Sequence, residues 1–108
     1  MPVIHIDYDN EQLSEAEIKA LVKATHEIVS GVTGIADVPV YAQYPQHKYK
    51  IAPIEIFVRF SDHKIKDLDA LTSEFKQKLV EWKNQEKFAH KINLTVIPMH
   101  WKIEIDIS

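Results

Sequence analysis

The chain has 108 residues, of which 45% are hydrophobic and 27% charged, and its formal net charge at pH 7 is −3. This composition is that of an ordinary globular domain, and the acidic balance argues against a nucleic-acid partner, which favours a basic face. The absence of cysteine excludes disulfides, thiolate catalysis and cysteine-ligated metal sites. No apolar run is long enough to cross a membrane and no signal-peptide pattern is present, so we expect a cytoplasmic protein with no membrane partner.

The first element is an apolar stretch over residues 2–8 that reads as a β-strand. Its first residue, Pro2, becomes a free secondary amine once Met1 is removed. Such an amine at the mouth of a pocket can act as a general base whose position is fixed by a whole sheet. The alternative interpretation is that Pro2 only begins a strand, where its missing N–H costs nothing.

A complete helix-start signature follows. Ser14 is the expected N-cap, Glu17 closes a capping box, and Leu13 and Ile18 can form a hydrophobic staple. The apolar periodicity then predicts a long amphipathic helix that stops at the glycines at 31 and 34.

The remaining elements are read from alternation and periodicity. We expect strands over 38–44, 54–60 and 92–97 (ended by Pro98), a helix from about 67 to 82 or slightly beyond, and a short tail strand over 101–107.

The two halves of the chain resemble each other. Pro2–Ile6 matches Pro53–Phe57, 51 positions later, and each is followed by a turn, a helix and an apolar strand. The sequence therefore predicts an α+β fold in a single domain, 1–108, with repeat units of about 2–45 and 53–98. Right-handed crossovers would place both helices on one face of a four-stranded sheet. Apolar side chains on the other face predict a homo-oligomer that covers it, with the tail strand added to a neighbour's sheet edge.

These features together resemble the tautomerase superfamily, in the branch of macrophage migration inhibitory factor and 5-carboxymethyl-2-hydroxymuconate isomerase. The residues that carry the resemblance are Met1-Pro2 before an apolar strand, the Leu13–Glu17 helix start, the repeat at Pro53 and the tail strand. The resemblance spans the whole chain, and Pro2 is its one specific signature. It implies a homotrimer with active sites at subunit boundaries, acting on a small carbonyl or carboxylate compound without a cofactor.

By this resemblance, Pro2 is the general base of a tautomerase or isomerase. It would take a proton from the carbon beside the carbonyl of an enolisable keto acid and return it elsewhere. A solvated α-amine has a pKa of roughly 7.7–8.0, and desolvation or a nearby cation lowers it towards the optimum for a base at neutral pH. The enolate-like intermediate then needs a cation or hydrogen-bond donors.

Candidate substrate-binding residues come from three places. Arg59 is the only arginine and suits a carboxylate, although it can instead pair with Glu55 on the same strand face. Tyr41 and Gln43 share a strand face and can donate hydrogen bonds, with packing or an interface role as the alternative for Tyr41. Two further candidates follow the fourth strand, where relatives bring an aromatic side chain towards a neighbour's site: His100 and Trp101, with packing as the alternative for Trp101.

One departure from the family pattern weakens the prediction of activity. Better-known isomerases carry a basic residue on or near the second strand, whereas 38–44 has none, and Lys48 and Lys50 are the nearest substitutes. The six histidines lack the short spacings of a zinc site, so we expect no metal. The alternative function is therefore a non-catalytic, ferredoxin-like oligomeric module that binds a metabolite or a protein.

Overall fold

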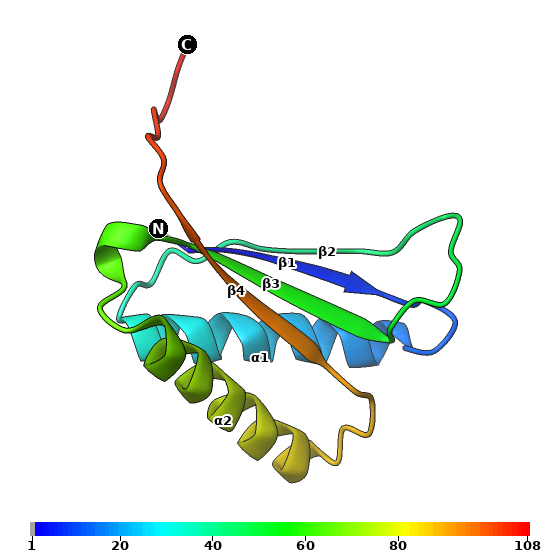
Figure 1. Ribbon diagram of the computed structural model, residues 1–108. Coiled ribbons are helices and arrows are strands. Elements are labelled where there is room, and N and C mark those ends of the chain that lie inside the picture. The colour runs from blue at the N-terminus through cyan, green and yellow to red at the C-terminus, as the bar shows by residue number, and fades with distance from the viewer. Residues whose placement is uncertain (1) are drawn as a thin grey trace.

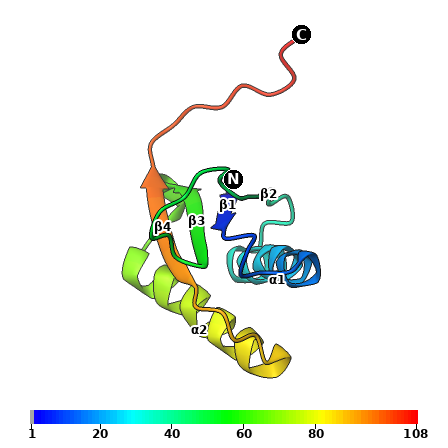
Figure 2. The ribbon, with the colours of Figure 1, turned by 90° about the vertical axis from the view of Figure 1, so that its right-hand side faces the viewer.

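The computed structural model describes residues 2–108 and shows two helices packed on one face of a four-stranded sheet (Figures 1 and 2). The elements in chain order are β1 (Val3–Tyr8), α1 (Glu15–Thr33), β2 (Val40–Gln43), β3 (Ile54–Ser61), the 3-10 turn η1 (Asp62–Lys64), α2 (Leu68–Glu86) and β4 (Asn93–Met99). The predicted α+β fold is confirmed.

The sheet has the order β2-β1-β3-β4. The first strands of the two repeats, β1 and β3, lie antiparallel in the centre, and each has the second strand of its own repeat parallel to it at an edge. Each parallel pair is joined by a helix, because parallel strands need a long crossover connection. The duplicated sequence pattern thus appears in space as two equivalent halves meeting at β1 and β3.

The core lies between the sheet and the helices. Alternate residues of the two central strands point into it, including Ile4, Ile6 and Ile56, each of which is fully buried. The helices supply Leu21 and Phe75 to the same apolar cluster. Because strand residues alternate between faces, the intervening side chains of β1 and β3 are turned to the face that no helix covers.

The start of α1 is the predicted one. The Ser14 hydroxyl accepts a hydrogen bond from the Glu17 amide (3.1 Å), and the Glu17 carboxylate accepts one from the Ser14 amide (2.9 Å). At the other end the helix continues through Gly31 and is capped by Gly34 at a φ of 74°. Gly34 is the stop because that backbone conformation is left-handed, which glycine adopts without a steric cost.

β2 covers Val40–Gln43 and is shorter than the strand predicted over 38–44. Two further predictions differ from the structure. The fourth strand does not end at Pro98 but continues through it to Met99, because β4 is an edge strand and edges tolerate proline. The tail strand predicted over 101–107 is not formed in the single chain, where this segment extends away from the body (Figures 1 and 2). A strand requires a neighbouring edge, and the tail has none beside it here.

The tail keeps its strict alternation even so. Its isoleucines are the most exposed apolar side chains of the segment, with 57%, 70% and 83% of Ile103, Ile105 and Ile107 accessible. All three alternate with charged residues, so an extended tail would present one apolar face and one charged face.

Neither helix in the described part of the chain combines the length and the apolar character that crossing a membrane requires. The cytoplasmic localisation stays a prediction.

Asp9 joins the turn after β1 to the distant connection between β2 and β3. Its carboxylate accepts hydrogen bonds from the Gln12 side chain (2.7 Å) and the Glu11 amide (3.0 Å), and forms an ion pair with Lys48. The hydrogen bond from Gln12, followed by that from Lys48, lowers the pKa of Asp9 from its ordinary 3.8 to about 2. Lys48 is therefore engaged in holding the connection to the body.

We expect Lys48→Met to lower the free energy of unfolding at about pH 6, and this loss to fade as the pH falls towards about 2. The pKa of Asp9 is depressed in the folded chain, so its stabilisation is complete above the unfolded-state pKa and disappears as the pH falls through the folded-state value. Urea denaturation at a series of pH values measures the difference. Lys50→Met is the matched control, because Lys50 lies over the Tyr49 ring (5.2 Å) and not against an acid. A loss that stays constant down to about pH 2 would contradict the assignment.

Candidate active site

Pro2 lies at one end of the sheet, where the start of β1 meets the ends of β3 and β4. Its side chain is fully buried. Just beyond it, the Ile4 amide donates to the Pro39 carbonyl at 3.0 Å and ties the beginning of β1 to the beginning of β2. The position of Pro2 is therefore fixed by a central strand with neighbours on both sides.

Arg59 lies beside this end on the uncovered face, directly opposite Val3. Its Nη1 donates to Nδ1 of His5 at 3.1 Å, and its guanidinium carbon is 5.8 Å from the centre of the Phe57 ring. Glu55 was the alternative partner from the sequence. It instead accepts a hydrogen bond from the Asn93 side chain at 3.0 Å. Among the described residues Arg59 forms no ion pair with a carboxylate, so its charge faces the uncovered side without a counter-ion.

His5 connects Arg59 to Tyr41. The His5 and Tyr41 rings are stacked, with centroids 5.2 Å apart and planes 18° apart. A cavity of about 280 Å³ is lined by His5, Asp7, Gln43, Phe57 and Arg59. The uncovered face thus carries a cation, an imidazole and a phenol in contact, and Tyr41 is more than half exposed.

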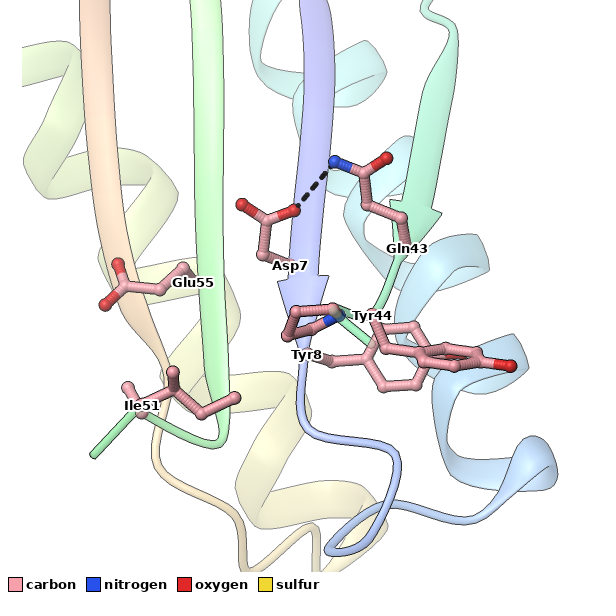
Figure 3. Close-up of a pocket in the computed structure, with 8 residues that line it drawn as sticks. Asp7, Tyr8, Gln43, Tyr44, Ile51 and Glu55 are labelled. Carbon is pink, nitrogen blue, oxygen red and sulfur yellow. Dashed lines mark hydrogen bonds between the residues drawn. The ribbon is translucent and has the colours of Figure 1, made fainter. Parts of the chain in front are cut away.

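Gln43 lies further from Pro2 than Tyr41 does. Its side-chain nitrogen donates to Oδ1 of Asp7 at 3.1 Å, near the opposite end of β1 (Figure 3). The structure therefore brings Arg59 and Tyr41 together through His5, and places Gln43, with Asp7, at the far side of the cavity that Arg59 and His5 line.

His100 and Trp101 follow β4 at the Pro2 end of the sheet, because Met99 is opposite Ser61 at the end of β3. His100 is almost fully exposed, with Nδ1 3.7 Å from Oδ2 of Asp62. Trp101 is partly buried where the tail leaves the body.

Sequence reasoning passed over three polar residues near Pro2 and Arg59. Ser61 is buried at the end of β3, and its hydroxyl lies 2.6 Å from Nδ1 of His63 in the following turn. The third residue is His5. Its position in the alternation of β1, on the face opposite the core residues Ile4 and Ile6, could have indicated a role on the uncovered face. In the described part of the chain, no three or more His, Cys, Asp or Glu side chains gather closely enough to hold a metal ion.

Comparison of the sequence with protein-family models and with curated proteins finds no match. Comparison with solved structures finds the same fold in several proteins of the tautomerase superfamily. A malonate semialdehyde decarboxylase has a TM-score of 0.65 and 12% identity, with 94% of this chain and 90% of that chain covered. A 5-carboxymethyl-2-hydroxymuconate delta-isomerase has a TM-score of 0.64 and 11% identity, with 100% of this chain and 89% of that chain covered. Macrophage migration inhibitory factor of Toxoplasma gondii has a TM-score of 0.56 and 15% identity, with 96% of this chain and 97% of that chain covered.

These likenesses identify the class of fold. The chain has the tautomerase-superfamily fold, and the resemblance stated from the sequence is confirmed at that level.

Proposed function

We propose that this protein is a cofactor-independent tautomerase whose general base is the nitrogen of Pro2, freed by removal of Met1. Removal of Met1 itself falls outside the described residues and stays a prediction. The observation that supports the proposal is the placement of Pro2 at the start of a central strand of this fold, one residue before Val3, which lies opposite Arg59. Arg59 has no carboxylate partner among the described residues. The decarboxylase with the same fold was also solved as a variant in which its first residue, a proline, is alanine.

In the proposed reaction, the uncharged Pro2 nitrogen takes a proton from the carbon next to the carbonyl of a keto acid. Arg59 holds the carboxylate or the developing enolate oxygen, because a guanidinium offers paired N–H donors to an anion. Tyr41, stacked on the cavity-lining His5, would donate a further hydrogen bond. Pro2 then returns the proton to a different atom, so the double bond moves and no cofactor is consumed.

We propose that the working form is a homotrimer in which the Pro2 end of each uncovered sheet face, and each tail, contact a neighbour. Two observations support assembly: the face carries the more than half-exposed ring of Tyr41, and the tail presents three exposed isoleucines. His100 and Trp101 would then complete a neighbour's site, and Gln43 would contribute from the sheet face.

The direct test is an assay of phenylpyruvate tautomerisation with protein whose N-terminus mass spectrometry shows to begin at Pro2. We expect the enol and keto forms to interconvert well above the spontaneous rate. A preparation that retains Met1 is the matched control, because its Pro2 nitrogen is an amide and cannot be a base. Equal rates in the two preparations would favour the non-catalytic, ferredoxin-like module.

A further inference from the structure

A row of four polar side chains crosses the uncovered face at the end of the sheet away from Pro2. The strand registers place Gln43 beside Asp7, Asp7 beside Glu55, and Glu55 beside Asn93. The outer two are amides and the inner two are carboxylates. Gln43 Nε2 donates to Oδ1 of Asp7 at 3.1 Å, and Asn93 Nδ2 donates to Oε1 of Glu55 at 3.0 Å. The amides thus orient both carboxylates while engaging one oxygen of each.

The two carboxylates form a like-charge pair. Asp7 and Glu55 are directly opposite each other on antiparallel strands, an arrangement that destabilises a sheet. Within residues 2–108, no lysine, arginine or histidine forms an ion pair with either of them. The row therefore concentrates negative charge without an ion pair among the described residues, and the nearest cation on the same face is Arg59, with which Asp7 shares the smaller cavity.

A cavity of about 590 Å³ adjoins this row (Figure 3). Asp7, Gln43 and Glu55 line it from the sheet, and the connection after β2 closes its other side. That connection contributes apolar surface from Tyr44, Pro45, Ile51 and Ala52. The cavity has the volume of a small-molecule site, with an apolar wall facing a few polar groups.

We propose that this cavity binds an organic ammonium ion, an amine carrying an aryl or alkyl group. The ammonium donates hydrogen bonds to the free oxygens of Asp7 and Glu55 and relieves their repulsion. Its hydrocarbon part packs on Ile51 and on the half-exposed ring of Tyr44, whose face also attracts a cation. Every lining residue comes from one chain and none is Pro2, so the proposal does not rest on the proposed role of Pro2. Asp7 and Gln43 also line the smaller cavity that contains Arg59.

An ammonium ion fits this row better than a metal ion does. Hard divalent cations take six or more oxygen ligands, and here both amides turn their nitrogens to the carboxylates (Figure 3 shows this for Gln43). The row thus offers carboxylate acceptors without further oxygen ligands from the amides, which matches a group with three N–H donors.

The test is calorimetric titration of the full chain with 2-phenylethylammonium, with 2-phenylethanol and 3-phenylpropanoate as neutral and anionic counterparts. We expect saturable binding of the ammonium alone, weakened about tenfold or more by Asp7→Asn or by Glu55→Gln. Each variant should also raise the thermal midpoint of the unliganded protein, because it removes the like-charge contact. That rise distinguishes lost binding from lost folding. Glu74→Gln, an exposed acid in the middle of α2, is the control and should change neither quantity.

Three results would overturn the proposal. The first is equal binding of the alcohol and the ammonium, and the second is unchanged affinity in both carboxylate variants. The third is a crystal structure in which a lysine or arginine of another copy fills the cavity.

Discussion

Replacing Pro2 by alanine is expected to lower kcat/KM for phenylpyruvate by about 10²- to 10⁴-fold, the usual contribution of a positioned general base. The pyrrolidine ring fixes the direction of the nitrogen lone pair, whereas the primary amine of alanine turns freely and is more strongly hydrated. The burial of Pro2 at the start of a central strand adds a second constraint, because the ring cannot move away from the sheet. Steady-state kinetics with both N-termini verified by mass spectrometry measures the effect.

Pro53→Ala provides the matched control for that variant. Pro53 precedes β3 as Pro2 precedes β1, but its nitrogen is an internal amide, and its carbonyl still accepts the Asp9 hydrogen bond after substitution. We expect kcat/KM to be unchanged. If Pro2→Ala and Pro53→Ala had the same kinetics as the unaltered protein, Pro2 would have no catalytic role.

Replacing Ile105 by asparagine is expected to shift the assembled protein towards monomers. Full burial of one isoleucine contributes about 1.5–3 kcal/mol, and asparagine both loses this and places an amide in an apolar contact. Ordering the tail costs about 1–2 kcal/mol for each residue's backbone, so the isoleucines and the backbone ladder must act together. The loss of one isoleucine from every copy then weakens each contact by about tenfold or more.

Analytical ultracentrifugation over a range of concentrations measures this shift. Glu104→Asn is the control, because in an extended tail residue 104 points to the face opposite the isoleucines, and it receives the same new side chain. We expect that variant to remain assembled, and deletion of 101–108 to give the largest dissociation. Equal behaviour of Ile105→Asn and Glu104→Asn, or a monomeric unaltered protein at high concentration, would refute the tail contact.

Features with local causes could be predicted from the sequence. The capping box at Ser14 depends only on residues three apart, and β3 follows from strict alternation over Ile54–Phe60. The likeness of the two repeats then predicted one four-stranded sheet with both helices on one face, because crossovers between parallel strands are right-handed.

Features that depend on contacts between strands could not be predicted. The pairing of Arg59 with His5, in place of Glu55, follows from the β1–β3 register, since directly opposite side chains lie closer together than residues two apart on one strand. The facing carboxylates of Asp7 and Glu55 have the same origin. The strand continues through Pro98 because β4 is at an edge, which no local pattern reveals.

The most direct measurement of the central claim is the ¹⁵N NMR titration of proline-labelled protein that begins at Pro2. The sequence has five prolines, and only a nitrogen at the chain terminus can titrate, because the others are tertiary amides. We predict one titrating signal with a pKa below about 7.7, the lower end of the range for a solvated terminal amine. No titrating signal, or one at or above the solvated range, would contradict the account, because that nitrogen would be blocked or protonated at neutral pH.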